Sequence, residues 1–198
     1  MTEKHDRQDN ERLARAIWEQ MRRQGLVHLY TGNGKGKTTA ALGLALRALG
    51  HERKVAVFQF FKRTKISTGE LLFVEKMDGS ITIEQFGTSR FATAEEKQMV
   101  VDSGQTVERG WALAREAVIK GDHDLVVLDE LTHAVKSGQV PLEDLVRVIR
   151  NKAPYLELVI TGRYGPPALQ DVCDYITEMK EIKHPYRNGI RAREGTEY

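Results

Sequence analysis

The chain has 198 residues, of which 40% are hydrophobic and 29% charged, a composition typical of a globular protein with one buried core. Its 30 lysines and arginines nearly balance 28 aspartates and glutamates, and a net charge of +2 does not favour a nucleic-acid or membrane-surface partner. No stretch approaches the ~20 apolar residues of a membrane helix. The polar N-terminus lacks the apolar core of a secretory signal, and the lone Cys173 excludes an internal disulfide. We therefore expect a reduced, cytoplasmic protein that binds neither nucleic acid nor membrane.

Residues 1–24 differ from the rest of the chain. Leu13, Ile17 and Met21 recur every four positions among charged residues, which predicts a helix with a narrow apolar stripe. Such a helix is either a solvated extension or an arm that docks on a partner subunit or over a site. We expect this N-terminal helical arm to precede one domain formed by residues 25–198.

From residue 26 onward, strands and helices are predicted to alternate. Strands are expected over residues 26–30, 54–60, 81–86, 124–129, 156–161 and 175–181. Helices are expected up to residue 50, over 67–77, over 93–120 with a break at Gly104, over 141–151 and just after 166–167. A basic tail that could end in a hairpin follows. The alternation predicts an α/β fold with a mostly parallel central sheet covered by helices on both faces, in which ligands bind at the carboxyl ends of the strands.

The strongest local signal is a phosphate-binding loop between the first strand and the first helix of this pattern. Glycines allow successive backbone N–H groups to turn towards phosphate oxygens, and the helix that follows directs its positive end at the same anion. The strict pattern requires glycine at position 31, where this chain has threonine, so the loop is a variant with additional glycines and an additional lysine. A glycine-rich turn without a ligand is the alternative. The expected phosphate ligands are Gly32, Asn33, Gly34, Lys35, Gly36, Lys37, Thr38 and Thr39.

Acidic and basic residues follow two later strands at the same predicted edge of the sheet. Asp129 and Glu130 end an apolar strand, where a carboxylate can hold Mg²⁺ together with the Thr38 hydroxyl, directly or through water. Spacing does not decide which carboxylate touches the metal, and an acidic strand cap is the alternative. Arg163 follows the strand over 156–161 and can reach a polyphosphate with its planar guanidinium, unless it is an ordinary surface arginine.

Weaker candidates lie near the ends of the second and third strands. Phe58 and Phe60 are expected in the core, and Lys62 lies just past their strand. Phe91 flanks a turn where an exposed ring could stack on a flat ligand, although core packing explains it equally well. The six histidines have no metal-ligand spacing, and we interpret them as structural or exposed.

These motifs together resemble the P-loop type of ATP:corrinoid adenosyltransferases, from about residue 26 to residue 198. The resemblance rests on the sequences TGNGKGKTTAALGLALRALG (31–50), VFQFFK (57–62), ITIEQFG (81–87), DLVVLDEL (124–131), LVITGR (158–163) and the tail EMKEIKHPYRNGIRAREGTEY (178–198). The resemblance implies a RecA-like core, a homodimer and transfer of the 5′-deoxyadenosyl group of ATP to Co(I) of a corrinoid. Inorganic triphosphate then leaves, and a flavodoxin-type protein supplies electrons.

The resemblance also implies roles for individual residues. Residues 32–39 would hold the triphosphate of ATP, and Thr38 and Glu130 would bind Mg²⁺ or Mn²⁺, with Asp129 acting through water. Lys37 and Glu130 would act by electrostatics on the leaving group and the metal, with no acid or base assigned. Lys62 and Phe91 are candidates for the corrinoid side, but the tryptophan that some family members carry near this phenylalanine is absent here. The arm over residues 1–24 resembles one that covers a neighbouring subunit's active site.

Two other functions fit the phosphate-binding loop. A P-loop kinase or ATPase would use Glu130 to activate water or an acceptor, and a non-catalytic carrier would bind nucleotide or corrinoid without turnover. The loop shows that phosphate is bound but not which bond breaks. Triphosphate as product distinguishes the adenosyltransferase from the phosphoryl-transfer enzyme, which releases ADP.

Overall fold

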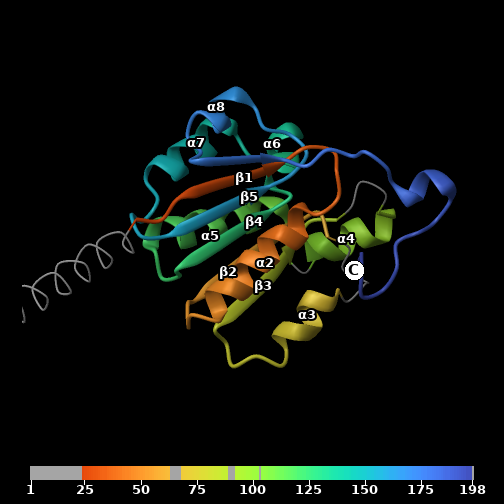
Figure 1. Cartoon of the computed structure of the whole chain (residues 1–198), viewed down its shortest axis with the longest axis horizontal. Coiled ribbons are helices and arrows are strands. Elements are labelled where there is room, and N and C mark those ends of the chain that lie inside the picture. The colour runs from red at the N-terminus through yellow and green to blue at the C-terminus, as the bar shows by residue number, and fades with distance from the viewer. Residues whose placement is uncertain (1–23, 63–67, 89–91, 103, 198) are drawn as a thin grey trace, which may run out of the picture.

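The computed structural model describes residues 24–62, 68–88, 92–102 and 104–197. Six parallel strands form one sheet in the order β3-β2-β4-β5-β1-β6 (Figure 1). The strands are β1 (Val27–Thr31), β2 (Val55–Phe60), β3 (Ile81–Phe86), β4 (Leu125–Asp129), β5 (Glu157–Thr161) and β6 (Tyr175–Glu178). The helices are α2 (Lys37–Leu49), α3 (Gly69–Val74), α4 (Ala94–Asp102), α5 (Val107–Lys120), α6 (Leu131–Lys136), α7 (Leu142–Arg150), α8 (Pro167–Gln170) and the 3₁₀ helix η1 (Pro185–Asn188).

The two faces of the sheet bury separate apolar clusters, which confirms the predicted α/β fold with helices on both faces. Ala41 and Ala45 of α2 pack on one face, against Val57 and Val127 of the central strands. On the other face, side chains of α5, α6 and α7 pack against Phe58 and the other apolar residues of that face. Every residue of β2 and β4 is buried, as expected for parallel strands covered on both sides.

Local signals explain where several helices begin and end. At the start of α4, Glu96 N–H donates to Thr93 Oγ1 (3.2 Å) and Thr93 N–H donates to Glu96 Oε2 (2.8 Å), which is a reciprocal capping box. The long helix predicted over 93–120 is interrupted near Gly104, as the sequence indicated, and continues as α5. Gly121 ends α5 with a positive φ of 72°.

Four expectations about elements need correction. The strand predicted over 175–181 ends earlier, at Glu178 of β6. The helix predicted over 67–77 is shorter in the structure, where α3 covers only Gly69–Val74. Helix α6 directly follows β4 and was not predicted, although the apolar residues Leu131, Ala134 and Val135 have helical spacing. The described part of the tail, up to residue 197, forms η1 and turns instead of a hairpin. Within the described residues, no helix has both the length and the apolar character needed to cross a bilayer.

Candidate nucleotide-binding active site

The loop between β1 and α2 has the backbone geometry that phosphate binding requires. Gly32 and Gly36 have φ values of 95° and 112°, in the left-handed region that side chains disfavour. A Cβ atom at Gly32 would also lie 2.4 Å from the carbonyl oxygen of Met179, so the β6 end leaves no room for a side chain. Gly34 N–H donates to the same carbonyl (2.7 Å), which anchors the loop to the residue that follows β6.

Lys37, the first residue of α2, points back into this loop. Its ammonium donates to the carbonyl oxygens of Gly32 (2.8 Å) and Gly34 (2.7 Å), and its side chain is mostly buried. Burial lowers the pKa of Lys37; Glu130 and Asp129 counteract this effect, whereas Arg163 adds to it. The lysine therefore lies at the centre of the loop as a partly desolvated cation whose present partners are neutral carbonyls. A polyphosphate would be a stronger partner for this charge.

Asp129, at the end of β4, is fully buried and joins three strands to the loop. Its Oδ1 accepts hydrogen bonds from the hydroxyls of Thr38 (2.8 Å) and Thr161 (2.7 Å). Its Oδ2 accepts from Gln59 Nε2 (3.3 Å) and lies 3.3 Å from Lys62 Nζ. Because Thr38 donates its only hydroxyl hydrogen to Asp129, the oxygen lone pairs of Thr38 remain available for a cation on the pocket side.

Glu130 occupies a strained corner between β4 and α6. Its φ of 60° is in the left-handed region, which is uncommon for a residue other than glycine and recurs at functional sites. Its N–H donates to Thr161 Oγ1 (2.9 Å), the same hydroxyl that donates to Asp129. Thr161 therefore fixes two adjacent acidic residues at once, with Asp129 buried and Glu130 lining the pocket.

A cavity of about 650 Å³ joins these residues at the carboxyl ends of the strands. The loop and α2 form one wall, and α3 forms another. The predicted site residues in its lining are Asn33, Gly34, Lys35, Gly36, Lys37, Thr38, Thr39, Lys62, Glu130 and Arg163. Gly32 and Asp129 lie behind this lining and contact it through their hydrogen bonds to Lys37 and Thr38. The volume is in the range of small-molecule sites.

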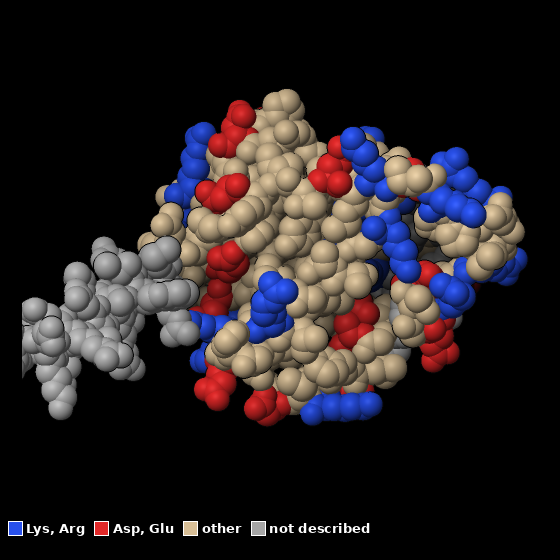
Figure 2. Space-filling model, viewed as in Figure 1, with Lys and Arg blue, Asp and Glu red and all other residues tan. Residues whose placement is uncertain are grey.

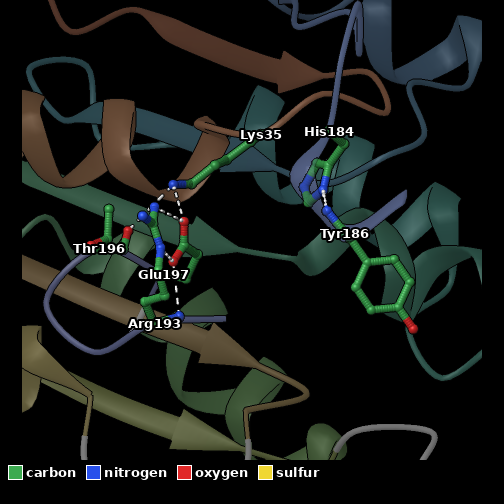
Figure 3. Close-up of polar contacts among 6 residues, drawn as sticks. All are labelled: Lys35, His184, Tyr186, Arg193, Thr196 and Glu197. Atoms are coloured by element: carbon green, nitrogen blue, oxygen red, sulfur yellow. Dashed lines mark hydrogen bonds and ion pairs between the residues drawn. The ribbon is translucent and has the colours of Figure 1, made fainter. Parts of the chain in front are cut away.

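The C-terminal tail forms the remaining wall, which the sequence did not predict. Glu197 pairs with Lys35 of the loop (3.0 Å) and accepts hydrogen bonds from Arg193 N–H (2.9 Å) and Nε (3.1 Å), as Figure 3 shows. Lys35 also donates to the Thr196 carbonyl (3.4 Å). The tail is rich in cations, and lysine and arginine side chains gather over it at the right of Figure 2. The exposed ones are Lys180, Lys183, Arg187, Arg191 and Arg193.

A second cavity, of about 400 Å³, opens beside the carboxyl end of β3. Its lining includes Gly87 and Thr88, together with Phe61 and His133, whose rings meet edge to face (4.8 Å between centroids). The next residues in the sequence, 89–91, are outside the described ranges, and they include the candidate Phe91. Its predicted role therefore stays a prediction.

The arrangement fits Mg²⁺ or Mn²⁺ held mainly by the nucleotide. Among the described residues, no group of three or more histidine, cysteine or acidic side chains is arranged to hold a metal by itself. Mg²⁺ commonly takes only one or two protein oxygens and fills its other positions with phosphate oxygens and water. Thr38 and Glu130 could supply such oxygens. Both oxygens of Asp129 already face two donors each, so direct contact between Asp129 and a metal would have to displace one of these donors.

Sequence reasoning missed the groups that hold the predicted residues in place. Thr161 and Gln59 contact Asp129, and Glu197 contacts Lys35. A glutamine inside the apolar run VAVFQF was the one visible signal for Gln59, because buried polar side chains need partners. Lys62 was considered for the corrinoid side, and in the structure its ammonium lies beside Asp129.

The comparisons with known proteins agree with this geometry. Residues 23–198 match the family model described as ATP:corrinoid adenosyltransferase BtuR/CobO/CobP. A corrinoid adenosyltransferase of Pseudomonas aeruginosa is 33% identical over 189 residues, covering 96% of this chain and 89% of the relative. One of Sinorhizobium sp is 35% identical (88% and 81% covered), and corrinoid adenosyltransferase CobA of Salmonella typhimurium is 31% identical (95% and 93% covered). The chain therefore belongs to the ATP:corrinoid adenosyltransferase family.

Proposed function

We propose that this enzyme transfers the 5′-deoxyadenosyl group of ATP to the Co(I) centre of a corrinoid and releases inorganic triphosphate. Family membership supports adenosylation of a corrinoid by ATP, and the P-loop pocket supports a bound triphosphate. In the structure, the observation that supports a bound triphosphate is that Lys37, Thr38, Glu130 and Arg163 line one cavity; family membership is what favours transfer of the adenosyl group. The kinase, ATPase and carrier alternatives are not favoured by the relatives, which are named as adenosyltransferases.

The reaction needs positioning and charge stabilisation more than acid–base chemistry. Co(I) supplies an electron pair that forms the bond to C5′ of the ribose, and the bond between C5′ and the triphosphate oxygen breaks with its electrons. Holding the two reacting atoms in line can lower the barrier by roughly 7–11 kcal/mol. Lys37 and the loop N–H groups stabilise the charge that develops on the leaving triphosphate. No side chain has to remove or deliver a proton.

The metal role is proposed for Thr38 and Glu130, with Asp129 acting through water. When bound, Mg²⁺ or Mn²⁺ would supply positive charge to the leaving triphosphate. Buried residues hold the two proposed metal ligands in place. Asp129 accepts a hydrogen bond from the Thr38 hydroxyl, and Thr161 accepts one from the backbone N–H of Glu130. Arg163, in the same cavity, is proposed to hold a phosphate oxygen with its guanidinium.

Several further features are proposed from the family and the composition. The protein would form a homodimer, receive electrons from a flavodoxin-type protein and lie in the cytoplasm. The chain would divide into an arm (1–24) and a domain (25–198). We also propose Phe91 and Lys62 on the corrinoid side.

Product analysis tests the proposal directly. The enzyme is incubated with ATP, Mg²⁺ and a chemically reduced corrinoid, and the adenosylated product is followed by its absorption spectrum. Anion chromatography then identifies the phosphate product. We expect one triphosphate for each adenosylated corrinoid. ADP and orthophosphate would favour phosphoryl transfer, and stable retention of both substrates without product would favour a carrier.

A further inference from the structure

The side chain of Gln59 is a fully buried polar group within the apolar strand β2. Strand alternation places it on the same side as Val55 and Val57, which pack in the cluster under α2. A buried amide without partners is costly, whereas an apolar side chain at this position would pack without that penalty. The amide therefore has to be explained by its partners.

Gln59 makes three hydrogen bonds, and they permit only one orientation of its amide. Its Nε2 donates to Asp129 Oδ2 (3.3 Å) and to Glu70 Oε1 (3.0 Å), and its Oε1 accepts from Gln85 Nε2 (2.9 Å). A flipped amide would turn its oxygen towards two carboxylates and its NH₂ group towards the NH₂ of Gln85. Both N–H donors are therefore committed to acidic groups.

The two acidic partners of Gln59 belong to different walls of the nucleotide pocket. Asp129 fixes Thr38 at the start of α2, whereas Glu70 is in the first turn of α3 and lines the pocket. Gln59 and Lys62 both contact Oδ2 of Asp129. The other carboxylate oxygen, Oδ1, therefore faces the hydroxyls of Thr38 and Thr161. Replacing Gln59 should therefore disturb both Asp129, which orients the proposed metal ligand Thr38, and helix α3 on the other side of the pocket.

We propose that Gln59 is a positioning residue for the metal–nucleotide site, which holds Asp129 in the orientation that presents Thr38 to the cation and couples it to Glu70 of α3. This inference rests on the proposed function, because it takes the pocket to bind ATP with a divalent metal. Residues that orient metal ligands typically change metal affinity by about 10- to 100-fold when they are replaced. Gln59 should act on the metal-dependent part of ATP binding rather than on ATP binding in general.

The test compares Gln59→Leu with Val57→Ala, in the full chain. Both changes affect the same face of β2, but Val57 has an apolar side chain and lies outside the polar network. Isothermal calorimetry gives the Kd of ATP with Mg²⁺ and with EDTA, and the ratio of the two values measures the metal contribution. Amide hydrogen exchange of α3 in the ligand-free proteins gives a second readout. Gln85→Leu, which leaves both N–H donors of Gln59 in place, serves as a milder variant should Gln59→Leu fail to fold.

We expect Gln59→Leu to reduce the metal contribution by about ten-fold or more, and to speed exchange in α3. Val57→Ala should leave the metal contribution as in the wild type, although exchange in α3 can change because Val74 of α3 packs in the same apolar cluster. Gln85→Leu should shift both readouts in the same direction as Gln59→Leu, but less. A wild-type ratio in Gln59→Leu, or in Gln85→Leu when it alone folds, would overturn the inference while leaving the proposed function intact. Metal-independent ATP binding by the wild type would instead overturn the metal assignment and this inference with it.

Discussion

Two of the walls of the nucleotide pocket are of opposite character. The wall formed by the ends of β1, β4 and β5 is built on buried groups, since Asp129 is fully buried and Thr161 donates to it at 2.7 Å. The wall formed by the C-terminal tail is built on exposed ion pairs, such as that between Lys35 and Glu197 (Figure 3). Both walls contact the phosphate-binding segment 32–39: the strand-end wall through Thr38, which donates to Asp129, and the tail wall through Lys35, which pairs with Glu197.

This difference predicts different sensitivities. Buried, charge-assisted hydrogen bonds keep their strength in salt, whereas exposed ion pairs are screened and contribute little to stability. The strand-end wall should therefore determine whether ATP binds and reacts. The tail wall should adjust affinity, with a clear dependence on ionic strength. Variants in each wall can test that division.

The largest effect is expected at Lys37. Replacement by alanine removes a cation aimed at the triphosphate, and a charge-assisted hydrogen bond contributes about 1.5–3 kcal/mol. Lys37→Ala should lower adenosyl transfer at least about ten-fold while the thermal unfolding midpoint stays near that of the wild type. Lys35→Ala, in the same loop, is the matched control and should lose far less activity. Near-normal turnover of Lys37→Ala would contradict the loop assignment.

The next-largest effect is expected from deleting the N-terminal arm, which should change corrinoid binding but not the ATP binding that the two walls provide. Every predicted phosphate ligand lies after residue 31, so deletion of residues 1–22 should leave ATP affinity unchanged. We propose from family resemblance that the arm covers a corrinoid site of the neighbouring subunit. Its loss should then weaken corrinoid binding and lower transfer roughly ten-fold, because water would gain access to the Co(I) centre. Paired titrations with ATP and with corrinoid measure the effect. Unchanged corrinoid affinity and turnover would make the arm a solvated extension.

The strand-end wall is largely predictable from sequence, for a physical reason. Its residues immediately follow strands, and parallel strands bring their carboxyl ends to one edge, so the amino-acid sequence alone places the loop, Asp129, Glu130 and Arg163 together. The fold is predictable for the same reason, because continuous apolar runs such as that over residues 124–129 indicate buried parallel strands.

The remaining contacts are not predictable because they depend on tertiary geometry. Glu197 lies 162 positions from Lys35 along the chain, and no pattern in the tail indicates that pair. Helix α6 starts immediately after β4 at a strained Glu130, without the capping residue that normally marks a helix start. Gln59 is noticeable as an exception in its strand, but its partners come from three other elements.

The metal assignment predicts an intermediate effect within the strand-end wall. Thr38→Ala removes a hydroxyl oxygen proposed to face the cation, and Glu130→Gln removes a pocket carboxylate. Each should raise the Mg²⁺ concentration required for half-maximal transfer by roughly ten-fold, in line with the loss of one bond to a charged group. Thr38→Ser keeps the hydroxyl and should behave like the wild type. A new pH dependence in Glu130→Gln with unchanged Mg²⁺ dependence would indicate a proton-transfer role instead.

The smallest effect is expected at Glu197, in the tail wall. Hydrogen bonds from Arg193 and Lys35 hold the pKa of Glu197 at about 2, below its ordinary value of 4.5. A lowered pKa means that this contact stabilises the folded chain above pH 4.5 and is lost only as the pH falls through about 2, so the ion pair is intact at any working pH. Salt, rather than mild acid, should therefore weaken it.

Because Glu197 neutralises Lys35, it competes with the triphosphate for that ammonium. Glu197→Gln should tighten ATP binding about two- to five-fold at low salt, the range expected for an exposed ion pair. The gain should shrink at high salt and stay the same between pH 5.5 and pH 8. Glu194→Gln removes another exposed tail carboxylate and should leave the Kd unchanged. If Glu197→Gln weakened ATP binding instead, the tail would hold the nucleotide directly. ATP binding would then depend on both walls, and not on the strand-end wall alone.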